Sequence, residues 1–259
     1  MSAARPAWDA LDLAGAPGDA PAAFCADLSS EGLLAAYRCG LFPLPAADEY
    51  ARSLNEVLFE DQVAAGAIAL LGEDDQTPYR VAWWSPDPRP VIRLDRVRLG
   101  SRLARRLRNK LAWSTSLDRA FTAVVAGCTA GREQHWLTGE LRAGLGHLHE
   151  SGWAHSVEVW EDGVDGELIG GAFGLRVGPV LSLDSMFNRR PDAARVAIAD
   201  LAARFAEAGG RLLDAQWDSP HIRSLGAVPI TRDRYLSTLR EPAAGHPLPA
   251  APRPAARLA

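Results

Sequence analysis

The sequence predicts an α+β fold, and three observations support this. Residues 155–187 contain three strand-like stretches separated by two turns, the pattern of an antiparallel meander. A helical stretch and another strand follow, at residues 191–216. The chain has 259 residues, of which 47% are hydrophobic and 23% charged, enough for one large core or two modest ones. We find no internal repeats.

The C-terminal half gives the clearer pattern. A helix is expected at 139–150, and strands at 155–160, 167–177 and 180–187, with turns at 162–166 and at Gly178-Pro179. Pro191 begins a helix whose apolar positions include Val196, Ile198, Leu201 and Phe205, and Gly209-Gly210 ends it. A strand at 211–216 and a helix at about 231–239 complete the region.

The N-terminal part predicts a smaller α/β lobe. Residues 1–23 look irregular, and Ser29 or Ser30 can cap a helix over 31–38. Residues 55–71 are compatible with a helix, 72–78 with a loop, and 91–94 with a short strand. We therefore expect a lobe at 1–97 and a second domain at 98–240. Residues 241–259, rich in Pro and Ala, are expected to form a disordered tail.

A tryptophan pair, Trp83-Trp84, runs into the proline-rich segment 85–90. Each proline fixes its own φ and favours an extended conformation at the residue before it. Adjacent side chains of an extended segment point to opposite faces, so the two indoles cannot both enter one core. One is expected to pack inside, and the other is free to stack elsewhere.

Positive charge is concentrated between Arg93 and Lys110, because eight of the 28 basic residues lie within these eighteen consecutive positions. Ser101 can cap a helix reaching Lys110, and Leu99, Leu103 and Leu107 form its apolar stripe. The basic residues on the neighbouring face are Arg102, Arg105 and Arg106. Such a face can attract polyphosphate even on a chain of net charge −4, although many basic faces are merely solvated.

Several classes of protein are not supported. No apolar run is long enough to span a bilayer, and the N-terminus lacks a secretory signal. The three scattered cysteines suit a reducing cytoplasm, where we expect the protein to reside. The sequence does not support a metal site, a dinucleotide fingerprint, a phosphate-binding Gly-Lys-Ser/Thr motif or a nucleophile elbow.

Two strand ends carry polar pairs suited to chemistry. Asp214 and Gln216 fall on one face of their strand, and a carboxylate there can orient an amide whose oxygen accepts a hydrogen bond from an attacking amine. Ser182 and Asp184 share a face of another strand, and Asp184 can receive a cationic ligand. Both pairs could instead satisfy nearby backbone groups.

A set of motifs occurs in order between about Leu28 and Leu239, and together they resemble the leucyl/phenylalanyl-tRNA–protein transferase family. The motifs are Gly40-Leu41-Phe42-Pro43, the segments 83–89 and 155–160, Leu168-Ile169-Gly170-Gly171, Ser185-Met186-Phe187, Asp214-Ala215-Gln216, and His221 with Ser224-Leu225-Gly226-Ala227.

The resemblance implies a C-terminal domain like the N-acetyltransferases (GNAT-like), with a mostly antiparallel sheet. It implies transfer of Leu or Phe, with Met also possible, from aminoacyl-tRNA to proteins that begin with Arg or Lys, which marks them for degradation. No cofactor or metal is implied, and we expect a monomer that does not bind membranes.

The resemblance also assigns roles to residues. Asp214 polarises Gln216, which helps deprotonate the attacking α-amine, and Trp136 stacks on the terminal adenosine of the tRNA. The basic helix contacts the acceptor-stem backbone through Arg102, Arg105, Arg106 and Lys110. The expected substrate-binding residues are Asp184, Trp136, Ser185, Met186, Ala172, Phe173, Trp83 and Trp84.

Three departures from the family pattern stand out. Leu44 occupies the position of a second tryptophan at the adenosine site, and about thirty residues are inserted near 45–80, where Tyr50, Phe59 or Tyr79 could supply a replacement aromatic. Asp184 replaces a glutamate that is longer by one methylene.

Two other functions stay open. One is an acetyl-CoA-dependent N-acetyltransferase, although residues 188–194 lack the glycines that hold a pyrophosphate. The other is a non-catalytic protein that binds tRNA or degradation signals.

Overall fold

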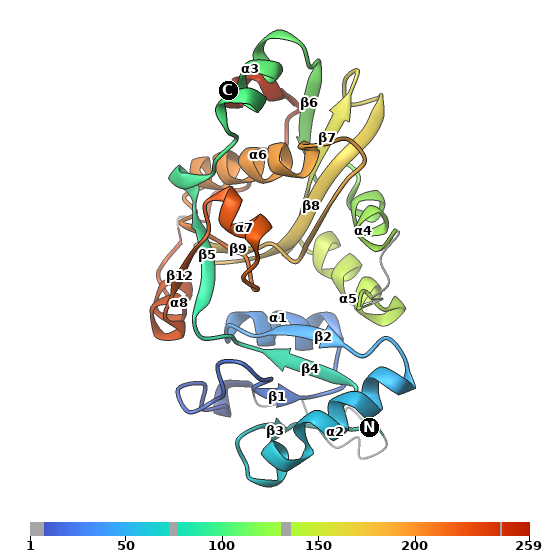
Figure 1. Cartoon of the computed structure of the whole chain (residues 1–259), viewed down its shortest axis with the longest axis vertical. Helices are drawn as coiled ribbons and strands as arrows, with labels where there is room; N and C mark the ends of the chain where they lie inside the picture. The colour runs from blue at the N-terminus through green and yellow to red at the C-terminus, as the bar shows by residue number, and fades with distance from the viewer. Residues whose placement is uncertain (1–7, 73–76, 131–135, 244) are drawn as a thin grey trace. The chain divides into compact units, whose positions relative to one another are not determined.

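The computed structural model describes residues 8–72, 77–130, 136–243 and 245–259 (Figure 1). Its contacts divide the chain into two compact units. Unit 1 comprises Met1–Arg89, Gly131–Leu148 and Ile230–Ser237, and unit 2 comprises Pro90–Ala130, His149–Pro229 and Thr238–Ala259. Both contain helices and strands, which confirms the α+β class. The division differs from the expected domains 1–97 and 98–240, because two later segments of the chain fold with unit 1.

In unit 1, the described residues form a four-stranded sheet of order β2-β4-β1-β3. Its strands are β1 (Ala23–Phe24), β2 (Phe42–Pro45), β3 (Ala69–Leu70) and β4 (Val81–Trp84). The other elements that begin in unit 1 are η1 (Trp8–Ala10), α1 (Ser30–Arg38), α2 (Glu49–Ala64), α5 (Gly139–Glu150) and α8 (Arg232–Leu239).

Helix α1 begins where the sequence predicts. The hydroxyl of Ser29 accepts a hydrogen bond from the backbone N–H of Gly32 over 3.1 Å, which satisfies one of the unpaired donors of the first turn. Leu33, Ala36 and Tyr37 are buried on the inner face. Gly40, at φ +85°, follows the helix in a conformation that a side chain disfavours.

Helix α2 begins six residues earlier and ends seven residues earlier than the predicted 55–71. Asp48 caps it, because its carboxylate accepts the backbone N–H of Ala51 over 2.8 Å. Gly66, at φ +74°, lies two residues beyond its end. The chain then extends into β3.

In unit 2, the described residues form a nine-stranded sheet of order β12-β5-β11-β9-β8-β7-β6-β13, with β10 paired to β8. Its strands are β5 (Arg89–Arg93), β6 (Trp113–Leu117), β7 (Ala154–Glu161), β8 (Glu167–Val177), β9 (Val180–Ser182), β10 (Ser185–Asn188), β11 (Leu212–Asp214), β12 (Val228–Ile230) and β13 (Arg253–Pro254). The other elements are η2 (Leu94–Arg96), α3 (Ser101–Asn109), α4 (Phe121–Thr129), α6 (Ala193–Glu207), α7 (Pro220–Leu225) and η3 (Ala255–Leu258).

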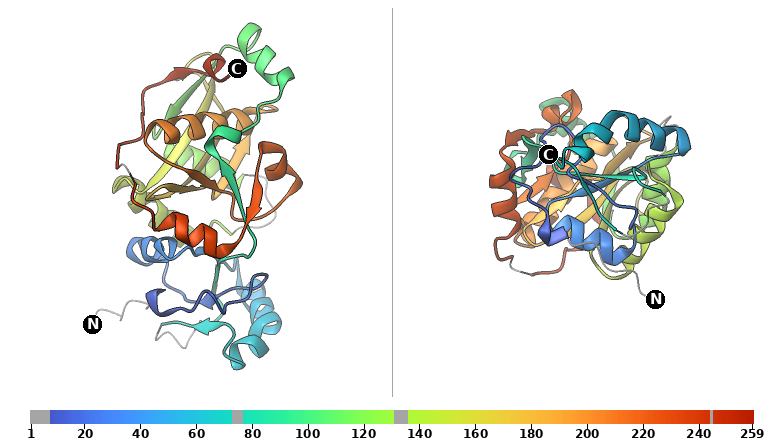
Figure 2. Two further views of the ribbon diagram at one scale, coloured as in Figure 1. Left: turned by 90° about the vertical axis from the view of Figure 1, so that its left-hand side faces the viewer. Right: turned by 90° about the horizontal axis from the view of Figure 1, so that it is seen from below.

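Helix α6 lies against the sheet of unit 2 (Figure 2), and the main buried cluster of this unit contains residues of α6 and of the strands that it packs against. Val196, Ile198, Leu201 and Phe205 are all fully buried, which confirms the apolar face predicted for α6. Strand β6 and helix α4 were not predicted.

The expected third strand, 180–187, is two strands in the structure. β9 pairs with the end of β8 and runs parallel to β11, whereas β10 pairs with β8 around residues 170–173. A Cβ atom on Gly174 would lie 1.7 Å from the carbonyl oxygen of Ser182, so only glycine permits this crossing. The break between the two strands leaves Asp184 outside regular strand pairing.

Residues 245–259 contain β13 and η3, so over this range the expectation of a disordered tail at 241–259 is corrected. β13 pairs with β6, and Arg253 forms an ion pair with Glu207 over 2.6 Å. The buried Arg204 donates to the carbonyl oxygens of Pro249 and Ala251, and Ala255 is fully buried. Composition alone did not reveal these few anchoring contacts. None of the helices in the described ranges is both long and apolar enough to cross a bilayer.

Candidate active site

Three chain segments of unit 2 bring Asp184, Asp214 and Gln216 together. Asp214 is the last residue of β11, where it pairs with Ser182 of β9. The backbone N–H of Leu183 donates to the carbonyl oxygen of Asp214 over 2.8 Å, and that of Asp184 donates to Phe173 over 3.0 Å. The break between β9 and β10 is thereby held between β8 and β11.

Gln216 is fixed at both its backbone and its side chain. Its backbone N–H donates to Oδ1 of Asp214 over 3.0 Å, and its side-chain Nε2 donates to Oδ1 of Asp184 over 2.6 Å. Its φ of +60° lies in the left-handed region, so it no longer belongs to the strand. The sequence predicts that Asp214 and Gln216 lie on one face of the same strand. In the structure, the left-handed turn at Gln216 brings the two residues together instead.

The hydrogen bond to Asp184 sets the direction of the amide. A carboxylate only accepts hydrogen bonds, so the NH₂ group of Gln216 faces Asp184 and its carbonyl oxygen points elsewhere. Gln216 and Asp214 are buried, and Asp184 is half-buried. In such surroundings a hydrogen bond to a charged group is stronger than in water. The arrangement can hold the amide oxygen ready to accept a hydrogen bond from an amine.

The predicted pocket residues lie beside this triad on β8 and β10. Met186 pairs with Ala172 and Ser185 pairs with Phe173, so the four form two adjacent cross-strand pairs. Ala172 and Phe173 are fully buried, and Met186 packs against the core of unit 2. Within the described chain, the buried hydroxyl of Ser185 has no hydrogen-bond partner. These residues and the triad thus lie on or next to adjoining strands of the sheet in unit 2.

The tryptophan pair, Trp83 and Trp84, lies in unit 1. Trp83 is fully buried, its indole N–H donates to the carbonyl oxygen of Cys25 over 2.8 Å, and its ring lies 4.6 Å from that of Trp8. The assignment of Trp83 to substrate binding is therefore corrected, because its indole offers no face to a ligand. The half-buried Trp84 packs edge-on against Phe59 of α2 at 6.2 Å. One tryptophan packs inside, as expected of an extended pair.

The residues discussed for the adenosine site differ in exposure. Trp136 is half-buried and follows the undescribed residues 131–135. Leu44 pairs with Ala82 between β2 and β4. Of the aromatic residues in the inserted segment, Tyr79 is buried, Phe59 is half-buried and Tyr50 is exposed.

Helix α3 has the apolar and basic faces that the sequence predicts. Leu103 and Leu107 are buried, while Arg102, Arg105 and Lys110 are exposed. Gly100, instead of Ser101, is the N-cap residue, and no side-chain hydrogen bond caps the helix.

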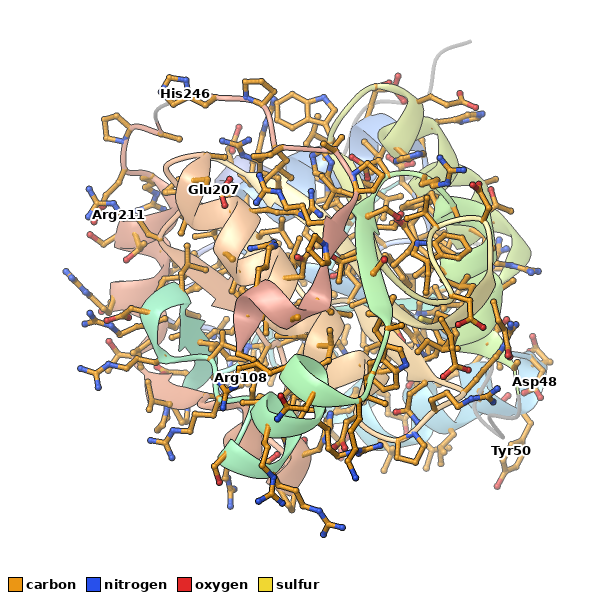
Figure 3. All side chains as sticks on the ribbon, turned by 90° about the horizontal axis from the view of Figure 1, so that it is seen from above. Asp48, Tyr50, Arg108, Glu207, Arg211 and His246 are labelled. Carbon is orange, nitrogen blue, oxygen red and sulfur yellow. The ribbon has the colours of Figure 1, made fainter. Side chains whose placement is uncertain are left out.

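The arginines of α3 are not equivalent. Arg106 lies 3.3 Å from the carboxylate of Asp192 and forms an ion pair with it. Arg108, which was not among the predicted tRNA-binding residues, is exposed, and Figure 3 shows its position on the helix. Its position in the basic run between Arg93 and Lys110 is the sequence feature that indicates it as a candidate tRNA-binding residue.

Sequence reasoning missed a buried carboxylate on β7. Glu158 accepts hydrogen bonds from the hydroxyls of Ser116 and Ser156, each over 2.5 Å, and from the backbone N–H groups of Arg119 and Ala120 over 3.4 Å. Burial raises the pKa of Glu158 above its ordinary value, and these hydrogen bonds oppose the shift. The residue lies at the N-terminal end of α4, which covers β8 and β10.

Within the ranges that the structure describes, no group of three or more His, Cys, Asp or Glu side chains is placed to hold a metal ion.

The comparisons with known proteins place this site in a family. The family model described as leucyl/phenylalanyl-tRNA protein transferase matches residues 91–240, more than half of the chain and all of the triad. The chain belongs to the leucyl/phenylalanyl-tRNA–protein transferase family. Proteins named leucyl/phenylalanyl-tRNA–protein transferase in Chromohalobacter salexigens and in Shewanella sp. (strain W3-18-1) are 36% and 35% identical to it.

These similarities extend beyond the matched region of the family model. The alignment with the Chromohalobacter protein covers 97% of this chain and 88% of the relative, and that with the Shewanella protein covers 83% and 78%. A namesake from Alkalilimnicola ehrlichii is 42% identical over 62% of each chain. Among solved structures, a conserved protein of unknown function from Bacteroides thetaiotaomicron VPI-5482 gives a TM-score of 0.44 at 13% identity over 97% of both chains, too weak a likeness to inform the fold.

Proposed function

We propose that this member of the transferase family moves Leu or Phe from aminoacyl-tRNA to the N-terminal α-amine of proteins that begin with Arg or Lys. The observation that carries the proposal is the hydrogen bond from Gln216 to Asp184, which leaves the amide oxygen of Gln216 available for an amine. The reaction takes place in the cytoplasm, where charged tRNA is made, and it marks the product for degradation.

The chemical step is an aminolysis of an ester. The lone pair of the α-amine attacks the carbonyl carbon, a C–N bond forms, and the C–O bond to the terminal ribose breaks. The amine loses one proton, and the departing ribose hydroxyl gains one. Because the ester is already activated, the enzyme mainly has to position the two substrates and supply a deprotonated amine.

Each residue of the triad has a role in this step. The side-chain oxygen of Gln216 accepts a hydrogen bond from the α-amine and aligns its lone pair with the ester. Asp184 holds the Gln216 amide and adds a negative charge that favours a cationic first residue. Asp214, to which the resemblance assigned the polarisation of Gln216, holds the backbone N–H of Gln216 in its left-handed turn, and Asp184 takes the side-chain amide instead.

The tRNA is held by other parts of the chain. Arg102, Arg105 and Lys110 are exposed on α3 and suit the phosphates of the acceptor stem, with Arg108 beside them. Trp136 stacks on the terminal adenosine, and Ser185, Met186, Ala172 and Phe173 form the pocket for the Leu or Phe side chain.

Unit 2 is proposed to be GNAT-like. In its sheet β6, β7 and β8 form an antiparallel meander, and β9 then runs parallel to β11. The reactive triad lies where these strands cease to pair regularly.

The proposal is tested by a transfer assay. Labelled Leu and Phe, each charged on its tRNA, are incubated with the protein and a peptide that begins with Arg, and a matched peptide that begins with Ala is the control. We expect label to appear at the N-terminus of the Arg peptide alone. Acetylation of either peptide by acetyl-CoA, without aminoacyl transfer, would instead identify an N-acetyltransferase.

A further inference from the structure

The outward face of α2 is apolar. Tyr50, Leu54, Val57 and Leu58 expose 78%, 45%, 73% and 57% of their surface, respectively. They follow one another at intervals of four, three and one residues, so they form a single stripe along the helix. Figure 3 shows the side chain of Tyr50 extending away from the ribbon near Asp48. Contiguous exposed apolar side chains of this kind mark interaction sites on soluble proteins.

The opposite face of α2 packs against unit 1, so the orientation of the stripe is fixed. Phe59 and Val63 pack against the small core of unit 1. The side-chain amide of Asn55 donates to the carbonyl oxygen of Tyr79 over 2.9 Å. The four outward side chains are therefore not required to hold the helix in place.

A row of negative charge accompanies the stripe along one side. Glu49, Glu56 and Glu60 recur at intervals of seven and four residues, which places them on one edge of the helix. Asp48 and Asp61 add charge near its two ends. Arg52 is the single cation between residues 48 and 64, and it pairs with Glu49 over 2.6 Å and with Glu56 over 3.1 Å. The segment has five acids and one arginine, hence a formal charge of −4.

We propose that α2 docks, as an amphipathic helix, into an apolar groove of another protein whose edge carries a row of Lys or Arg residues. Tyr50, Leu54, Val57 and Leu58 would enter the groove, as expected for helix-in-groove recognition. The acidic edge would face the basic rim and set the orientation of the helix.

The negative charge of α2 disfavours three other binding partners for its apolar face. A second copy of the chain would bring an identical acidic edge against this one, and like charges repel. Anionic lipid headgroups and nucleic acids would also be repelled by a segment of charge −4. A basic protein groove satisfies both the apolar and the charged features.

The test begins with a photo-crosslinking amino acid placed at Val57 of the full chain, expressed in the source cells. A crosslinked protein is identified, purified and titrated with the uncrosslinked full chain at several salt concentrations. We expect binding that weakens with salt, and a loss of affinity of at least about tenfold in Val57→Asp. Glu60→Lys should also weaken binding and reduce its salt dependence.

The matched control is Val228→Asp, the same change at another exposed valine, on β12. It should leave binding intact. All variants should keep the unfolding midpoint of the parent, and transfer to the Arg peptide should be unaffected by Val57→Asp. Failure of the docking proposal is thus separate from failure of the proposed enzyme function.

The opposing outcomes are specific. The absence of a crosslink that depends on position 57, or a partner whose affinity is equal for the parent and for Val57→Asp, would overturn the proposal. So would a self-crosslink accompanied by dimers in light scattering. Binding to vesicles of phosphatidylglycerol and phosphatidylethanolamine that is lost in Val57→Asp would identify a lipid surface instead.

Discussion

The side-chain amide of Gln216 donates to the carboxylate of Asp184 over 2.6 Å, while its backbone N–H is held by Asp214 over 3.0 Å. Two carboxylates from different strand ends thus fix one residue whose φ is +60°. A glutamine held at both ends loses little freedom when substrate binds, which is the condition for precise positioning of an amine.

Loss of the charge at position 184 should impair catalysis. In Asp184→Asn the Gln216 amide loses an anionic acceptor, and a charged hydrogen bond contributes about 1.5–3 kcal/mol. We expect kcat/KM for the Arg peptide to fall about 10- to 100-fold, with affinity for charged tRNA unchanged. Asp218→Asn, at an exposed aspartate paired with Arg223, is the control and should stay active. Unchanged kcat/KM in Asp184→Asn would remove this carboxylate from the site.

Asp214 should matter for stability as well as for activity. Asp214→Ala leaves the buried backbone N–H of Gln216 without its acceptor, and we expect a loss of about 1–3 kcal/mol in the free energy of unfolding. Asp214→Asn keeps an oxygen that can accept and should lose less. Denaturant titrations measure both variants. Equal stability of Asp214→Ala and the parent would show that the turn is held by other contacts.

The exposed arginines of α3 should dominate the salt dependence of tRNA binding. Each phosphate contact contributes a slope of about −0.9 to a plot of log K against log salt on a duplex. The double substitution Arg102→Gln and Arg105→Gln should therefore make the slope less steep by about two. Arg106→Gln should change it less, because Arg106 already pairs with Asp192. Filter binding across salt concentrations distinguishes them, and an equal effect of Arg106 would contradict this ranking.

Glu158 should raise the free energy of unfolding of the protein at acidic pH. Its pKa is raised in the folded state, mainly by burial, so the native protein holds this proton at pH values where the unfolded chain has released it. Its contribution to the free energy of unfolding is therefore greatest at low pH and declines as pH rises above about 4.5, the ordinary value, toward the raised pKa.

The variant Glu158→Gln isolates this contribution. The difference in unfolding free energy between the parent and the variant should shift in favour of the variant as pH rises through that window. Denaturant titrations between about pH 4 and pH 7 give the difference directly, with the ordinary pKa as the starting point. A difference independent of pH would mean that Glu158 has the same pKa in the folded and unfolded states.

The sequence predicted those features that depend on local pattern. The Ser29 cap of α1, the buried leucines of α3 and the apolar positions of α6 follow from side-chain spacing, and the structure confirms them. The positions of Asp184, Asp214 and Gln216 at strand ends indicate a polar site, and in the structure Gln216 is hydrogen-bonded to both carboxylates.

Features that depend on tertiary contact were beyond local pattern. The break between β9 and β10 follows from the close approach of Ser182 to Gly174, and the left-handed turn at Gln216 follows from its two carboxylate partners. The C-terminal segment is anchored by Arg204 and Arg253, whose partners lie more than forty residues away along the chain. The burial of Glu158 depends on the packing of α4 over the sheet, which the local pattern of β7 does not contain.

The most direct test of the account compares chemistry with binding in Gln216→Ala. Single-turnover transfer from charged tRNA to the Arg peptide is measured together with the Kd for the charged tRNA. We predict that the rate of transfer falls about 10²-fold or more, because the attacking amine loses the hydrogen-bond acceptor that aligns it, while the Kd changes less than about twofold. Equal losses in rate and in affinity, or a transfer rate equal to that of the parent, would contradict the role assigned to Gln216.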